Sequence, residues 1–206
     1  MPSGGGKEGK TCTGGRLEAS FLSLFALRHG EAACGALGHT RRDTPLSPEG
    51  VARLRALATR SEFPFAREPL PLIVSSSFRR ALESAAILHE LLGWPATSDA
   101  RFDEFDFGWE DETLADFFTR ISTERFRAFS AAPLCVALPG AESFADFFAR
   151  VNAAFRDLLP RAEHGPVLIV AHDGVNRALS LIADGKGADA WGEAPPWQPG
   201  ELRPLG

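Results

Sequence analysis

The sequence predicts an α/β protein in which helices cover both faces of a central, mainly parallel sheet, a three-layer α/β/α arrangement. Three short apolar runs, at residues 22–27, 69–75 and 167–171, are typical of strands buried on both faces. Stretches with helical spacing of apolar residues lie between these runs, and such alternation favours parallel strands joined by helices. The length of 206 residues and the 44% hydrophobic content suit a single domain with a substantial core.

The expected helices begin and end at recognisable residues. Ser47 is a typical capping residue, Pro48 suits the first helical position, and Glu49 would lie near the positive end of the helix dipole. The apolar spacing predicts a second helix over 79–92 that ends at Gly93. Further helices are predicted over 114–129, 144–159 and 175–183.

Phenylalanines are concentrated in two of these helical stretches. One stripe includes Phe144, Phe147 and Phe155, and a second group lies within 114–129. The second group consists of Phe117, Phe118, Phe126 and Phe129. We interpret both groups as packing residues, because core burial requires this spacing, and keep a ligand pocket as the alternative.

Composition excludes several classes of protein. The formal net charge of -5 argues against a general nucleic-acid binder. No apolar run approaches the roughly 20 residues of a membrane helix, and the start of the chain does not follow the signal-peptide pattern. Cys12, Cys34 and Cys135 form no CxxC pair, so the sequence indicates neither a zinc site nor a disulfide framework. We therefore expect a cytoplasmic protein without a membrane or nucleic-acid partner.

The N-terminal residues 1–18 are rich in Gly, Ser, Thr and Lys, which predicts a disordered tail. Residues 4–11 formally satisfy the phosphate-loop pattern G-x-x-x-x-G-K-[ST]. That pattern binds phosphate only between a buried strand and a helix, and neither is predicted around it. We therefore assign the folded domain to residues 19–206.

Polar residues follow the three predicted strands. His29 follows the first strand, residues 75–77 are serines at the end of the second, Arg79 and Arg80 come next, and His172 follows the third. Because ligands bind beyond the carboxyl ends of parallel strands, both histidines should point toward one site. Neutral imidazole is a competent nucleophile, and arginine matches phosphate oxygens. The pattern favours phosphoryl transfer. Structural histidines and a metal site remain alternatives, although H-x-H and H-E-x-x-H spacings are absent.

Six segments resemble the histidine phosphatase superfamily, the phosphoglycerate-mutase-like group, over about residues 24–181. They are Leu27-Arg28-His29-Gly30-Glu31, Asp43-Thr44-Pro45-Leu46-Ser47-Pro48-Glu49-Gly50, Ser75-Ser76-Ser77-Phe78-Arg79-Arg80-Ala81, Phe102-Asp103-Glu104-Phe105-Asp106-Phe107-Gly108, Pro139-Gly140-Ala141-Glu142-Ser143 and Val170-Ala171-His172-Asp173-Gly174-Val175. A single R-H-G match would be weak, whereas six matches in order are specific. The resemblance implies a phosphoglycerate-mutase-like fold with a helical insert at about 111–138.

The resemblance also implies roles for individual residues. His29 would attack phosphorus and carry the phosphoryl group, while Arg28, Arg80 and His172 would bind that group. Glu104 would donate a proton to the leaving group, and a raised pKa from partial burial would suit this role. On the residues alone, Glu104 would be taken for an exposed loop carboxylate.

Some positions depart from the family pattern. Ala32 and Gly35 stand where the family usually has Ser or Thr and a phosphate-binding Asn. Arg41 or Arg42, inserted nearby, could replace this donor, or both could lie in a solvated loop. Asp173 beside His172 would either orient the imidazole or face solvent.

The expected function is metal-independent phosphomonoester hydrolysis of the histidine acid phosphatase type, through phosphohistidine and without a cofactor. The substrate would be a small phosphorylated metabolite. Gly38-His39-Thr40 with Asp43 resembles the G-H-T-D run of α-ribazole phosphatases, which favours that specificity or a broad one. Two alternatives stay open: a phosphoglycerate mutase, and a catalytically weak member that binds a phosphorylated ligand or a protein. A homodimer is compatible with the sequence.

Overall fold

The computed structural model describes residues 23–33, 41–59, 71–109 and 112–206. These residues include a five-stranded sheet of order β3-β2-β4-β1-β5. Its strands are β1 (Leu24–Arg28), β2 (Leu72–Ser75), β3 (Ala96–Ser98), β4 (Val167–Ala171) and β5 (Leu202–Pro204). The first four strands pair in parallel, and β5 runs antiparallel to β1 at one edge. The predicted mainly parallel sheet is therefore confirmed.

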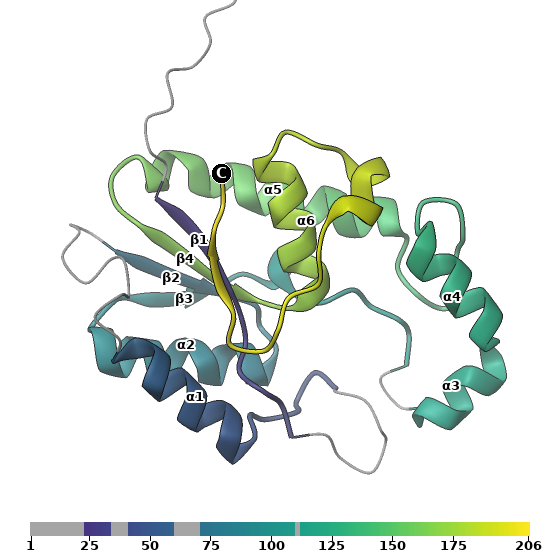
Figure 1. Ribbon diagram of the computed structural model, residues 1–206, viewed down its shortest axis with the longest axis horizontal. Coiled ribbons are helices and arrows are strands. Elements are labelled where there is room, and N and C mark those ends of the chain that lie inside the picture. The colour runs from purple at the N-terminus through teal and green to yellow at the C-terminus, as the bar shows by residue number, and fades with distance from the viewer. Residues whose placement is uncertain (1–22, 34–40, 60–70, 110–111) are drawn as a thin grey trace, which may run out of the picture.

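Helices cover both faces of this sheet (Figure 1). On one face lie α1 (Pro48–Ala58) and α2 (Arg79–Leu92), and on the other α5 (Phe144–Ala162) and α6 (Asp173–Ala183). Alternate strand residues supply the two cores: Leu168 packs toward α1 and α2, whereas Ile169 packs toward α5 and α6. All five residues of β4 are buried, which explains its continuous apolar sequence. The three-layer α/β/α prediction is confirmed.

Local signals fixed the ends of α1 and α2. The Ser47 hydroxyl accepts a hydrogen bond of 3.0 Å from the Gly50 N–H, and Pro48 takes the first helical position. Helix α2 ends at Gly93, whose φ of +69° is a left-handed conformation that glycine adopts readily. Both boundaries agree with the sequence-based prediction.

The helical insert differs from the prediction of one helix over 114–129. It contains α3 (Leu114–Arg120) and α4 (Thr123–Ala131), which lie at one end of the molecule beyond α5 and α6 (Figure 1). Ile121 between them is extended, and the Ser122 side chain caps α4 by accepting from the Arg125 N–H at 3.1 Å. The chain therefore leaves the helical conformation at Ile121 and begins a new helix after Ser122.

The C-terminal segment completes the sheet, which the sequence analysis did not foresee. After the short helix η2 (Ala188–Glu193), the chain returns to pair β5 with β1. Trp197 is fully buried, and the Arg203 guanidinium carbon lies 4.3 Å from the centre of its ring. The tail predicted for residues 1–18 lies outside the described residues, and within them no helix is long and apolar enough to cross a membrane.

Candidate active site

The structure brings His29, Arg80 and His172 together at the carboxyl end of the sheet. His29 follows β1, His172 follows β4, and Arg80 lies in the first turn of α2. The two imidazole rings are 5.0 Å apart between centroids, and all three residues are buried. The placement that the sequence predicted for these three residues is confirmed.

The Arg80 guanidinium lies between the two imidazoles. Its Nε donates to His29 Nε2 at 3.0 Å, and its Nη2 is 3.2 Å from His172 Nδ1. Its Nη1 donates to the Arg41 carbonyl at 2.6 Å. Because a guanidinium has donors only, both ring nitrogens that face it must present lone pairs. Arg80 thus fixes the protonation pattern of the site.

His29 has the protonation state that a nucleophile requires. Its Nδ1 lies 2.6 Å from the Gly30 carbonyl, which can only accept, so Nδ1 carries the proton and Nε2 the lone pair. Burial, followed by the positive charges of Arg80 and Arg28, lowers the pKa of His29 from 6.5 to about 3. The imidazole is therefore neutral near pH 7.

A chain of hydrogen bonds orients His172. Its Nε2 lies 2.8 Å from the Ser76 hydroxyl, which donates to Asp103 at 2.8 Å. Ser76 therefore accepts from Nε2–H, consistent with a lone pair on Nδ1 toward Arg80. Burial, then the charge of Arg80, lowers the pKa of His172 well below its usual value. No role was predicted for Ser76 or Asp103; the available signal was that Ser76 directly follows β2 and that Asp103 directly precedes Glu104.

Glu104 is placed against the start of α6. Its carboxyl oxygens accept from the N–H groups of Phe105 at 3.0 Å and Gly174 at 3.2 Å. A Cβ on Gly174 would lie 2.5 Å from a Glu104 oxygen, so glycine is required for this approach. Burial, with a smaller contribution from Asp173, raises the pKa of Glu104 against the opposing effect of these N–H groups. The carboxyl is thus suited to hold a proton.

Arg28 is linked to the C-terminal segment through Asp173. Arg28 Nη1 donates to the Trp197 carbonyl and lies 4.0 Å from a carboxylate oxygen of Asp173. The same oxygen accepts from the Trp197 N–H at 2.7 Å. Asp173 therefore links Arg28 to the C-terminal segment. From the sequence, Asp173 was expected either to orient the His172 imidazole or to face solvent. Trp197 itself was missed, because its position depends on the unforeseen pairing of β5.

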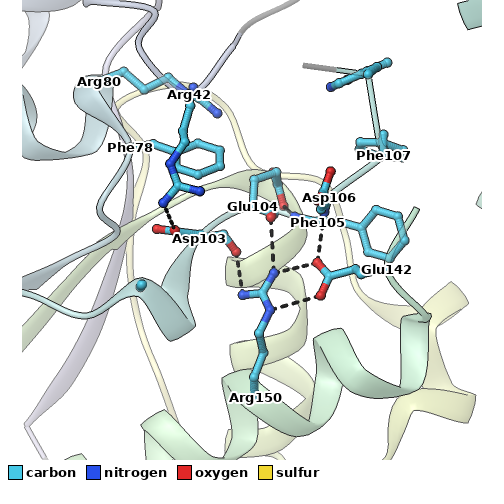
Figure 2. A pocket seen from close by; sticks show the side chains of 12 residues that line it. Arg42, Phe78, Arg80, Asp103, Glu104, Phe105, Asp106, Phe107, Glu142 and Arg150 are labelled. Atoms are coloured by element: carbon cyan, nitrogen blue, oxygen red, sulfur yellow. Dashed lines mark hydrogen bonds and ion pairs between the residues drawn. The ribbon is translucent and has the colours of Figure 1, made fainter. Parts of the chain in front are cut away.

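Arg41 and Arg42 make different contacts beside this site. Arg41 contributes its backbone carbonyl to Arg80. The Arg42 guanidinium donates to Asp103 and to Ser77, both at 3.0 Å, and lies 4.9 Å from the centre of the Phe78 ring (Figure 2). Gly35 and the segment 38–40 lie outside the described residues. A phosphate-binding role for either arginine stays a prediction.

Two cavities adjoin the site, and Glu104 lines both. The first has a volume of about 370 Å³ and is lined by Arg42, Phe78, Arg80 and Arg150, among others (Figure 2). Its Arg150 is held by Glu142 at 2.6 Å and by the backbone carbonyls of three neighbouring residues. The second has a volume of about 260 Å³ and largely aromatic walls.

The protein is thus an α/β protein with two buried imidazoles at the carboxyl end of its sheet and one guanidinium, that of Arg80, between them. The chain belongs to the histidine phosphatase superfamily (branch 1), which matches residues 24–202. A glucosyl-3-phosphoglycerate phosphatase of Mycolicibacterium vanbaalenii is 32% identical over 82% of this chain and 76% of its own length.

Two further comparisons agree with this family. A Citrobacter koseri protein named "Probable phosphoglycerate mutase GpmB" is 27% identical over 84% of this chain and 79% of its own length. Among solved structures, mycobacterial glucosyl-3-phosphoglycerate phosphatase in complex with inorganic phosphate superposes with a TM-score of 0.71. That structure is 28% identical and covers 87% of this chain and 86% of its own. The predicted family and fold are therefore confirmed, and phosphatase-named relatives support a phosphatase.

Proposed function

We propose that the protein is a metal-independent phosphomonoester hydrolase of the histidine acid phosphatase type. It acts on a small phosphorylated metabolite through a phosphohistidine on His29. The observation that carries this proposal is the neutral His29 imidazole, whose Nε2 lone pair faces the Arg80 guanidinium in a buried site. An incoming phosphate would take the donors of Arg80 that now contact the rings, so its phosphorus would lie next to the nucleophile.

In the first step, the Nε2 lone pair of His29 forms a bond to phosphorus while the bond from phosphorus to the ester oxygen breaks. Glu104 gives its proton to that oxygen, so an alcohol leaves and Glu104 becomes a carboxylate. Arg28, Arg80 and His172 bind the transferring group, whose negative charge spreads over its equatorial oxygens.

In the second step, water replaces the alcohol. Glu104 takes a proton from this water as its oxygen attacks phosphorus and the bond from Nε2 to phosphorus breaks. Inorganic phosphate leaves, and His29 and Glu104 regain their starting protonation states. The raised pKa of Glu104 serves both steps, because its carboxyl must lose and regain one proton in each cycle.

Trapping the phosphoenzyme tests this function. We expect p-nitrophenyl phosphate to be hydrolysed in EDTA, and an alkaline quench during turnover to yield a peptide phosphorylated on His29. EDTA-sensitive activity would indicate a metal enzyme instead, and exchange between 2- and 3-phosphoglycerate that outpaces hydrolysis would indicate a mutase. Absence of turnover on a panel of phosphomonoesters would leave only a phosphate-binding role.

Arg80→Lys is expected to lower kcat/KM about 10²-fold. Lysine keeps the positive charge, but its single ammonium cannot reproduce the planar fork that reaches both imidazoles. The matched control is Arg79→Lys, since Arg79 is the exposed preceding residue and pairs with Glu83. The test compares the steady-state kcat/KM of each variant with that of the wild type. Comparable losses in both would show that helix α2, rather than the guanidinium between the imidazoles, had been disturbed.

A further inference from the structure

Glu104 restricts where the leaving group can lie. Its proton must reach the ester oxygen, so that oxygen must be within hydrogen-bonding distance of the Glu104 carboxyl. The carboxyl lines both cavities, and the alcohol part of the substrate must therefore extend into one of them.

The first cavity is lined by ion pairs as well as by the aromatic side chains of Phe78, Phe105, Phe107 and Trp109. Arg150 pairs with Glu142 at 2.6 Å, and Arg42 pairs with Asp103 at 3.0 Å. Arg150 also donates to backbone carbonyls, which further fixes its position. A group entering this cavity would compete with these existing interactions.

The second cavity is walled mainly by aromatic rings. They include the side chains of Phe105, Phe107, Phe126, Phe129, Phe144 and Trp191. They pack edge to face or tilted, as the 4.8 Å separation of the Phe144 and Trp191 ring centroids illustrates. Some of the rings that the sequence indicated as packing residues, with a ligand pocket as the alternative, thus line a cavity.

The charged groups of the second cavity are compensated. Arg177 lies 4.0 Å from the centre of the Trp191 ring and donates to the carbonyls of Ala194 at 3.0 Å and Trp191 at 3.2 Å. Asp173, which also lines the cavity, accepts from the Trp197 N–H at 2.7 Å. A charged leaving group would lose its hydration against the rings without gaining a dedicated partner, whereas an apolar ring would bury its surface favourably.

We propose that the second cavity binds the leaving group, and that the preferred substrates are phosphomonoesters of alcohols that carry an uncharged aromatic ring. The inference rests on the proposed function. The volume of about 260 Å³ is slightly below the about 300 Å³ at which ligand pockets commonly begin, which suits one small ring system. Phosphomonoesters of charged or highly hydroxylated alcohols would be poorer substrates.

Three alkyl phosphates test the preference without a large change in leaving-group acidity: 2-phenylethyl, ethyl and glycerol 1-phosphate. We expect kcat/KM for 2-phenylethyl phosphate to exceed that of the other two at least about tenfold, because only its ring reaches the aromatic walls. Equal values for the three esters would overturn the inference while leaving the hydrolase intact. Failure to hydrolyse any of them would instead overturn the proposed function on which it rests.

Tryptophan substitutions at exposed positions show which of the two cavities binds the aromatic ring of the substrate. Ser130 lines the second cavity from α4, so Ser130→Trp should fill it and bring the ratio of kcat/KM for 2-phenylethyl phosphate over ethyl phosphate near one. Ala128→Trp, on the same helix but outside both linings, should keep the preference. Ala100→Trp, which narrows the first cavity, should also keep it. Loss of the preference in Ala100→Trp but not in Ser130→Trp would place the ring in the first cavity and overturn the inference.

Discussion

Replacing His29 with alanine is expected to lower kcat/KM on the order of 10⁴-fold or more, because the group that attacks phosphorus is removed. His172 also presents a neutral imidazole and a lone pair, on Nδ1, to Arg80, but it is fully buried, whereas His29 keeps 6% of its surface exposed. His172, the neighbouring imidazole, has its Nε2 bonded to Ser76 and lies at the side of the guanidinium. It is therefore a poor substitute for the nucleophile.

The matched control is His164→Ala, because His164 is exposed and lies between α5 and β4, at the end of β4 opposite to His172. Initial rates on p-nitrophenyl phosphate should be unchanged in this control and lost in His29→Ala, with equal circular dichroism spectra. Inorganic phosphate should still bind the inactive variant, since Arg28, Arg80 and His172 remain. Residual turnover within tenfold of the wild type in His29→Ala would be incompatible with a phosphohistidine on this residue.

The buried strands and several helix ends could be predicted from the sequence because each is marked by residues within the element itself or next to it. The strand β4 is apolar at every position since both of its faces are covered, and Ser47 and Gly93 mark helix ends by their own chemistry. By contrast, β3 is a three-residue exposed edge strand, and β5 depends on pairing with residues nearly the whole chain away. Neither strand has a local pattern that distinguishes it from a loop.

The site was predictable to the extent that it lies at strand ends. His29 and His172 follow β1 and β4, and parallel pairing of these two strands puts Arg28 beside Ala171 in register. The hydrogen bonds among Ser76, Asp103 and His172 could not be read from sequence, because they join side chains from three separate segments. The same holds for Asp173, whose role depends on where Trp197 returns to the site.

The proposed division of the cleft follows from the same geometry. Glu104 lies between a cavity lined by both ion pairs and aromatic rings and a cavity lined mainly by aromatic rings. The helical insert contributes Phe126, Phe129 and Ser130 to the second cavity alone. Changes confined to the insert could therefore alter the preferred alcohol without disturbing the residues that hold the phosphoryl group.

Glu104→Gln is expected to lower kcat about 10³-fold while changing inhibition by inorganic phosphate far less. Glutamine can still accept from the N–H groups of Phe105 and Gly174, so the local structure should persist, but it has no proton to give to the ester oxygen. The loss should be larger for ethyl phosphate than for p-nitrophenyl phosphate, because p-nitrophenolate leaves without protonation more easily. Asp106→Asn, in the same loop and lining the first cavity, is the matched control.

The rate of phosphoenzyme formation should depend on pH differently in the wild type and in Glu104→Gln, and the difference should lie on the alkaline side of the profile. The first step needs protonated Glu104, so this step should slow as pH rises through the raised pKa of this carboxyl. His29, with its pKa lowered to about 3, stays neutral well into the acid range and imposes no loss near pH 5. Single-turnover rates of phosphoenzyme formation should therefore fall toward alkaline pH in the wild type and lack this descending limb in Glu104→Gln. Equal losses of turnover and phosphate affinity, with the limb retained, would show that Glu104 binds the phosphoryl group instead of protonating the alcohol.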